Sequence, residues 1–346
     1  MKQHENILRN HGIDFLRGLC ILGVLFHHTC LYSGNYVPLY VKFISFLLEV
    51  PAFMFVSGLT MKYTHKDMII NGTLKLSLSF TLLSIILNLI SGTFTPVSVV
   101  APLFFQGMHL SSYWNVLSGS YWFAPMYVFV VILATVILQK FYPIYSSIAI
   151  GCFLLYVLSF FNFLPASFLS AFSINFLYGD LWGKGMCFLL FFFLFGYWWE
   201  EHQKLHSYRQ YIALILLIII GILFVLMYAY QGNIVFNLWH YKDDKGLPYI
   251  VASLIGVAGF ILIYKPQLHN SFLEYIGRYA IFYYIGQGLS SSCLKSVESY
   301  VELPWGYKLL CMFLLNIVLM VIFSEIFRLV YTAIGKIYFK IIHFLD

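Results

Sequence analysis

The chain has 346 residues, of which 61% are hydrophobic and 10% are charged, with a mean hydropathy of +0.84 and a formal net charge of +6. Soluble domains carry about 25% charged residues, so this composition excludes a sizeable soluble domain. The positive charge is spread over many loops, which is typical of membrane topology signals and argues against a nucleic-acid-binding surface. The composition therefore predicts an all-α membrane helix bundle.

Apolar runs of about 20 residues recur along the chain and predict about ten transmembrane helices. We expect residues 1–346 to form a single membrane domain whose first helix is retained, because no cleavage site follows it. The last residues, about 334–346, alternate apolar and basic side chains and are expected to form a short amphipathic helix at the membrane surface. The ten ranges are 13–33, 41–62, 73–92, 120–139, 143–164, 182–199, 210–230, 248–265, 274–294 and 308–331.

The loop charges predict the orientation of the bundle. An even number of helices places both termini on one side, and more of the loop lysine and arginine residues fall on that side than on the other. The positive-inside rule therefore predicts that both termini are cytoplasmic.

Two loops on the opposite side are long. Residues 93–119 contain no Lys, Arg, Asp or Glu, which favours a re-entrant segment or an outer lid. Residues 231–246 combine aromatic side chains with two aspartates, a composition that fits either a sugar-binding surface or an interfacial aromatic belt. The residues that these loops offer to a ligand are His109, Trp114 and Asn115 in the first loop and Trp239, His240, Tyr241, Asp243 and Asp244 in the second.

The six cysteines are scattered through the apolar runs. No pair has the C-x-x-C spacing of a zinc site, and nothing in their spacing indicates a disulfide framework. We therefore expect them to be small buried hydrophobic residues, and the sequence predicts no metal site.

The first predicted helix, DFLRGLCILGVLFHHTC, carries polar residues within an apolar run, where burial is costly without a partner or a function. Arg17 and His28 are 11 residues apart, which on an α-helix returns to within about 20° of the same face, about 16 Å along the axis. Asp14 shares this face, whereas His27 points about 100° away. The helix therefore presents a polar stripe with Arg17 near one end and His28 deeper in the bundle.

Histidine and arginine suggest a chemistry for this stripe. Histidine accepts and returns a proton near neutral pH, and arginine binds phosphate or carboxylate through two parallel hydrogen bonds. An anionic ligand at Arg17 and proton abstraction by His28 would use both properties. A structural role stays open, in which Asp14 pairs with Arg17 and His28 bonds a neighbouring helix.

The second predicted helix also contains a carboxylate. Glu49 lies among apolar residues and either orients His28, as carboxylates do in hydrolase triads, or pairs with Arg or Lys of another helix, or lies close to the outer interface. Pro51 is expected to kink the helix nearby. Near the end of the chain, Glu325 and Arg328 stand three residues apart and predict an ion pair on the helix surface.

Four segments in order resemble a known family. IDFLRGLCILGVLFHH (13–28) resembles the first helix of the integral-membrane acyltransferase 3 family, whose hallmark is an arginine, ten residues and then a histidine. EVPAFMFVSG (49–58), SYWFAPMYVFV (120–130) and FLEYIGRYAIFYYIGQ (272–287) resemble later segments of the same family. The resemblance covers most of the chain, and the ten expected helices agree with the family's usual number.

The resemblance implies transfer of an acyl group, commonly acetyl from acetyl-CoA, to a hydroxyl of an envelope sugar, a polysaccharide or a lipid-linked sugar. It implies a multi-pass protein of the bacterial cell membrane with acyl-CoA as co-substrate, no permanently bound cofactor and no metal. His28 and Glu49 are then the expected catalytic residues. The expected contacts to acyl-CoA are Arg17, Lys75 and Ser57, and those to the substrate are Asp14, Trp122, Tyr284 and Gln287.

The chain departs from the family pattern in three places. Lys75 stands where members often have an arginine pair, so the planar fork that binds phosphate is lost there. Gln287 stands where the late segment often ends in histidine, and glutamine does not shuttle protons at neutral pH. Glu49-Val50-Pro51 replaces the His-Met-Pro of one branch. These departures leave His28 as the main candidate base. Ser57, followed by Gly58, has an alternative role as a small-residue helix contact.

A polar stripe in a membrane bundle also fits a transporter or a polysaccharide-export component. Transporters often show inverted repeats and paired broken helices, and the sequence contains no corresponding halves. We therefore favour an acyltransferase and keep transport as the alternative.

Overall fold

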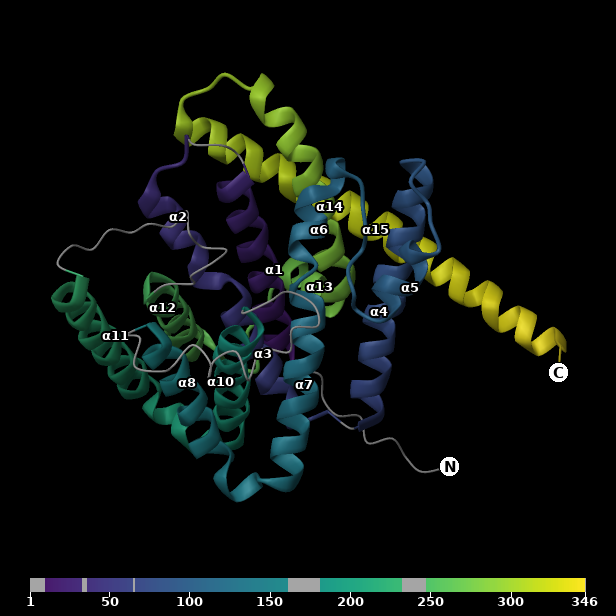
Figure 1. Cartoon of the computed structure of the whole chain (residues 1–346). Helices are drawn as coiled ribbons and strands as arrows, with labels where there is room; N and C mark the ends of the chain where they lie inside the picture. Colours follow the sequence, from purple (N-terminus) through teal and green to yellow (C-terminus); the bar gives the residue numbers. More distant parts are fainter. Residues whose placement is uncertain (1–9, 33–35, 65, 161–180, 232–246, 346) are drawn as a thin grey trace.

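The computed structural model describes residues 10–32, 36–64, 66–160, 181–231 and 247–345. Every regular element in this part of the chain is an α-helix or a 3-10 helix, which confirms the all-α prediction (Figure 1). The aromatic and acidic residues of the loop 231–246, which fit either a sugar-binding surface or an interfacial aromatic belt, lie outside the described residues.

Each of the ten predicted ranges coincides with one helix or with a closely spaced group of helices. The second range is divided into three pieces, and the ninth is divided into α13 and α14 at Tyr279. The helices that follow these ranges are α1 (His11–Tyr32), α2 (Leu39–Ser45), η1 (Phe46–Leu48), α3 (Val50–Met61), α4 (Lys66–Ile90), α7 (Phe123–Lys140), α8 (Tyr145–Phe160), α10 (Leu181–Glu201), α11 (Arg209–Gln231), α12 (Leu247–Ile263), α13 (Ser271–Arg278), α14 (Ala280–Val297) and α15 (Trp305–Leu345).

Length and apolar composition identify membrane spans among the described residues. Six segments are long and apolar enough to cross a bilayer, and the shorter apolar helices 142–158 and 249–263 accompany them. The protein is thus a multi-helix membrane protein, while ten crossings and cytoplasmic termini stay predictions. The six segments are His11–Leu31, Tyr40–Met61, Asp67–Ile90, Ser112–Lys140, Gln203–Ile222 and Trp305–Gly335.

The second predicted helix breaks where a kink was expected. Glu49 has an extended backbone with φ −87° and ψ −159°, and α3 starts immediately after it with Pro51 in its first turn. Proline is favourable there because its missing N–H group would have no intrahelical partner. Because of this break, Glu49 lies between η1 and α3 and belongs to neither helix. Its side chain is buried beside α1.

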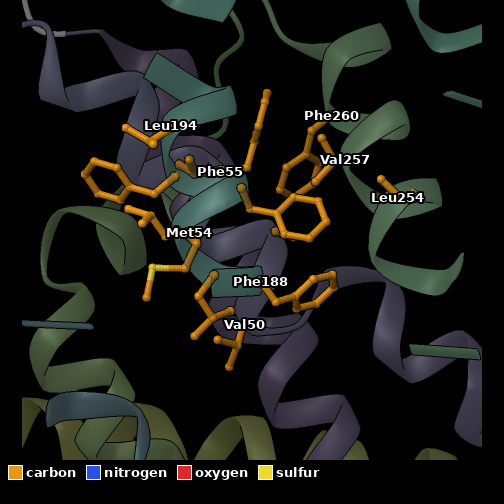
Figure 2. Packing of buried hydrophobic residues seen from close by; sticks show 14 of the residues in the cluster. Val50, Met54, Phe55, Phe188, Leu194, Leu254, Val257 and Phe260 are labelled. Carbon is orange, nitrogen blue, oxygen red and sulfur yellow. The ribbon is translucent and has the colours of Figure 1, made fainter. Parts of the chain in front are cut away.

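The main core lies between α3, α10 and α12. Figure 2 shows Phe55 of α3, Phe188 of α10 and Phe260 of α12 among its buried side chains. The backbones of α3 and α10 approach each other closely, because a Cβ atom on Gly58 would lie 2.0 Å from the Phe193 carbonyl oxygen. The small-residue contact that the sequence offered as one role of Ser57 and Gly58 is therefore present at Gly58.

A second close approach joins α1 to α13. A Cβ atom on Gly18 would lie 2.0 Å from the Leu273 carbonyl oxygen, and one on Gly277 would lie 1.9 Å from the Asp14 carbonyl oxygen. Only glycine fits at such a distance, since small residues let helix backbones touch. The two helices are therefore held in one relative position.

The uncharged loop 93–119 runs back along α4. It contains the short helices α5 (Val97–Leu103), η2 (Ser112–Trp114) and α6 (Asn115–Ser120), and α5 lies beside α4 in Figure 1. Ser77 donates a hydrogen bond to the Leu103 carbonyl, and Ser77 lies 13 residues, about 20 Å, before the end of α4. The structure favours the re-entrant form of this loop over an outer lid.

The last helix is continuous over 41 residues, and its C-terminal half extends away from the other helices (Figure 1). The segment expected to form a separate amphipathic tail, about 334–346, continues α15 without a break to Leu345.

Arg328 donates two hydrogen bonds to Glu325, at 2.9 and 2.7 Å, which confirms the predicted ion pair.

Adding a methyl group between α1 and α13 tests their close approach. We expect Gly277→Ala to lower the free energy of unfolding by about 1–3 kcal/mol, because overpacking at a backbone contact forces the helices apart. Thermal unfolding of the purified protein in detergent, followed by tryptophan fluorescence, measures the change. Gly151→Ala in α8 is the matched control, since no atom lies within 4 Å of its added Cβ. Equal unfolding temperatures for the two variants would contradict the described contact.

Candidate functional site

A cavity of about 230 Å³ opens near the N-terminal part of α1. Its walls come from α1, α3, α4, α7, α13 and α14, so it lies where segments from most of the chain meet. The lining residues are Arg17, Phe53, Ser57, Gly72, Lys75, Leu76, Phe123, Ala124, Tyr127, Gly277, Arg278, Tyr279, Ala280, Ile281, Phe282 and Tyr284.

Three cationic side chains line this cavity, which we call the cationic cavity. Arg17 is partly buried and donates a hydrogen bond of 3.0 Å to Thr60 Oγ1, whereas Lys75 and Arg278 are exposed at the mouth. Among the residues that the structure describes, Lys75 and Arg278 make no ion pair, and the Lys75 Nζ atom lies 4.9 Å from the centre of the Phe282 ring. Three like charges around one cavity favour a bound anion.

Arg17 also keeps its predicted neighbour. Its Nη1 atom lies 3.8 Å from Asp14 Oδ1, a loose contact one helical turn away. Asp14 is buried, and its carbonyl oxygen packs against Gly277 of α13. The aspartate therefore flanks the cationic cavity and is not part of its lining.

The inner wall of the cavity is aromatic. The Phe53 and Phe123 rings meet edge to face with centroids 5.7 Å apart, and Phe123 meets Tyr284 at 5.5 Å. Ser57 lies on the same wall, and its hydroxyl donates a hydrogen bond of 2.9 Å to the Phe53 carbonyl. The cavity would therefore suit a ligand with an anionic group, which would bind the cations at the mouth, and an apolar chain, which would lie along the aromatic wall.

His28 lies beyond the cavity and is buried. Its Nε2 atom is 3.5 Å from Ser120 Oγ, and the buried Gln287 of α14 is a polar neighbour of the ring. The Tyr284 hydroxyl donates a hydrogen bond to the Ser120 carbonyl. Tyr284 lines the cavity, so Tyr284 and Ser120 together connect the cavity to His28.

Glu49 lies beside His27 on the other side of α1. The distance from Glu49 Oε1 to His27 Nε2 is 3.7 Å. Ser45 donates its proton to the Lys42 carbonyl at 2.6 Å and therefore accepts one from His27 Nδ1 at 2.9 Å. The distance between His27 Nε2 and Glu49 is longer than a hydrogen bond, so the contact is electrostatic.

The two histidines are close neighbours. Their ring centroids are 6.0 Å apart, and Glu49 also interacts electrostatically with His28. We call His27, His28, Glu49, Ser120 and Gln287 the inner polar cluster. Glu49 can influence a charge on His28, although the charged group 3.7 Å from its carboxylate is His27.

The structure sorts the predicted site residues into two groups. Arg17, Ser57, Lys75 and Tyr284 line the cationic cavity, and His28, Glu49 and Gln287 belong to the inner polar cluster. Trp122 belongs to neither group, because it precedes α7 and packs against Phe123 and the main core. Their catalytic and binding roles stay predictions.

Sequence reasoning missed three residues of the site. Arg278 stands in the segment that resembled the family's late motif, and its charge before a tyrosine-rich helix was the available signal. His27 was set aside because it points away from Arg17 on the helical wheel, but that direction faces Ser45 and Glu49. Ser120 begins the segment 120–130 that resembled the family, but nothing in the sequence distinguished this serine from the other residues of the segment.

Comparison with known protein families decides the identity. A family model described as an acyltransferase domain, that of the acyltransferase 3 family, matches residues 10–328. The chain belongs to this family. Comparisons with curated proteins and with solved structures find no match.

Membership confirms the resemblance seen in the four segments and makes the protein a membrane acyltransferase, a transferase of groups other than aminoacyl groups. The matched region includes every residue of the cationic cavity and of the inner polar cluster. In this acyltransferase, the cavity can bind an anionic ligand at one end of α1, and the cluster can hold or move a proton further along the same helix.

Proposed function

We propose that the protein transfers an acyl group, commonly acetyl, from acyl-CoA to a hydroxyl of a cell-envelope sugar or polysaccharide. The convergence of Arg17, Lys75 and Arg278 on one cavity carries this proposal. Coenzyme A has phosphate groups at one end and an extended thiol arm at the other. The guanidinium groups would bind phosphate oxygens through paired hydrogen bonds, and the Lys75 ammonium would add a point charge.

The donor would enter from the cytoplasm, where acyl-CoA is made. Its phosphate groups would lie at the mouth of the cationic cavity, and its arm would follow Phe53 and Phe123 towards Tyr284. This direction agrees with the cytoplasmic termini that the loop charges predict. The acceptor would approach from the opposite side, near the re-entrant loop that ends in α6.

His28 would act as the general base. It takes the proton of the acceptor hydroxyl, and the resulting oxygen attacks the thioester carbonyl carbon. The new carbon–oxygen bond forms as the carbon–sulfur bond breaks, and the proton on His28 then passes to the CoA sulfur. Glu49 would stabilise the imidazolium during this transfer through its negative charge. Gln287 would orient the ring.

Tyr284 would link the two halves of the site. Its ring lines the cavity and its hydroxyl holds the Ser120 carbonyl, so it stands between the thioester and His28. Binding of both substrates would move Tyr284 aside and bring the thioester to the base. Direct transfer is favoured over an acyl-enzyme, because the cavity lining contains no cysteine and Ser57 has no adjacent base within that lining.

Neutralising one cation of the cavity tests donor binding. We expect Arg278→Gln to raise KM for acetyl-CoA about 10- to 150-fold, because a hydrogen bond to a charged group contributes roughly 1.5–3 kcal/mol. The turnover number should change less, since the phosphate groups do not react. Steady-state kinetics on purified protein in lipid nanodiscs measures both constants. Lys140→Gln, an exposed cation at the end of α7, is the control. An unchanged KM in Arg278→Gln would rule out the phosphate contact.

Replacing each histidine of the inner polar cluster tests the base. We expect His28→Gln to lower the transfer rate about 10²- to 10⁴-fold, the usual contribution of a positioned base, while acetyl-CoA binding is retained. His27→Gln should lose less, because His27 only borders the reacting groups in this account. The readout is label from radioactive acetyl-CoA in the envelope glycan fraction of membranes.

Two outcomes of this labelling experiment would contradict the proposal. Wild-type labelling by a folded His28→Gln variant would remove the base assignment. Substrate uptake by the wild-type protein without any labelled glycan or lipid would favour the transport alternative.

A further inference from the structure

A cluster of two histidines and one glutamate lies outside the cationic cavity. His11 begins α1, Glu274 is in the first turn of α13, and His269 is in the turn before α13. The Nδ1 atom of His11 is 2.6 Å from one oxygen of Glu274, and the Nδ1 atom of His269 contacts the other oxygen. All three groups can place one ligand atom within 4.8 Å of the others.

The exposure of the three side chains suits an ion that arrives from solution. The imidazoles of His11 and His269 are 50% and 67% exposed, whereas the Glu274 side chain is 6% exposed. The three groups that could bind an ion are therefore one buried carboxylate and two accessible imidazoles that contact it.

The glutamate is held in place by the start of its own helix. The Asn270 backbone N–H donates a hydrogen bond of 3.1 Å to Glu274 Oε1, and the Asn270 side chain accepts one of 3.0 Å from the Leu273 N–H. Glu274 is thus a preformed carboxylate ligand with an outer hydrogen bond to orient it.

We propose that His11, His269 and Glu274 form a binding site for a divalent transition-metal ion such as Zn²⁺. Two imidazole nitrogens and one carboxylate oxygen are a ligand set that Zn²⁺ takes with water in a fourth position. The same atoms bond one another through protons in the structure, and the ion would replace those protons. The site is independent of the donor and acceptor in the proposed function.

Such an ion would join α1 to α13. The two helices already touch at Gly18 and Gly277. A bound ion would add a second link, between the first turns of α1 and α13. Arg17 follows His11 by six residues and Arg278 follows Glu274 by four, which corresponds to about 9 Å and 6 Å along the two helices. Metal binding would therefore stabilise the part of the bundle that carries two cations of the cavity.

Metal titration of the intact protein tests the site. Full-length protein without a histidine tag is purified in detergent, stripped with chelator, incubated with Zn²⁺ and separated from free metal. We expect about one Zn²⁺ per chain and a metal-dependent rise in unfolding temperature, because an ion that binds the folded state stabilises it. The double variant His11→Ala/His269→Ala should bind at least about 100-fold more weakly and lose the rise.

The control is His202→Ala, which removes a histidine of comparable exposure, 46%, away from the cluster. It should bind Zn²⁺ as the wild-type protein does. If the double variant fails to fold, His269→Ala alone carries the test, because this side chain is mostly exposed. Absence of stoichiometric Zn²⁺ from the wild-type protein, or full binding by the folded variants, would overturn the proposal and leave a metal-free hydrogen-bonded cluster.

Discussion

The contact between α1 and α13 is the constraint on which the site depends. Gly18 and Gly277 let the two backbones touch, with carbonyl oxygens where side chains would otherwise stand. Arg17 directly precedes Gly18 on α1, and Arg278 directly follows Gly277 at the end of α13. Two guanidinium groups far apart in sequence are therefore brought to one cavity. Side chains at positions 18 and 277 would push α1 and α13 apart and separate the two guanidinium groups.

The cations of the cationic cavity lie at its mouth, where water can reach them. Ionised groups are costly inside a bilayer unless they are paired or reach water. Lys75 and Arg278 stay exposed, and Arg17 is only partly buried. Among the deeper groups, His27 hydrogen-bonds Ser45 and lies near Glu49. The cations at the mouth and the His27–Glu49 pair are thus tolerated where they lie.

The apolar wall between these two regions matters equally. Phe53, Phe123 and Tyr284 separate the cationic mouth from His28. In the proposed reaction, this wall would guide an acyl arm and exclude water from the thioester. The Tyr284 hydroxyl, bonded to the Ser120 carbonyl, is the point where the wall meets the inner polar cluster. In the proposed reaction, a donor in the cationic cavity would lie next to His28 without contacting it.

Much of the fold could be predicted because membrane helices follow from the length of apolar runs. The break at Pro51 and the shared face of Arg17 and His28 also follow from local rules of helix geometry. The helical wheel gives the direction of a side chain but not the neighbour it meets. For this reason the contact of Glu49 with His27 was not foreseen.

Contacts between residues far apart in the sequence could not be predicted for the same reason. Arg278 enters the cavity because α13 packs against α1, which no local pattern reveals. The cluster of His11, His269 and Glu274 joins residues as far as 263 positions apart, and the sequence predicted no metal site because the cysteine spacing was the signal considered. Trp122 matched a family segment, yet its position before α7 directs it to the core.

The most direct measurement is a structure of the protein in a lipid nanodisc with a non-reactive acyl-CoA analogue, determined by electron cryomicroscopy. The account predicts phosphate oxygens within hydrogen-bonding distance of Arg17, Lys75 and Arg278, with the acyl carbon beside Tyr284 and directed towards His28. An analogue bound away from these cations, or with its acyl end pointing out of the cavity, would contradict it.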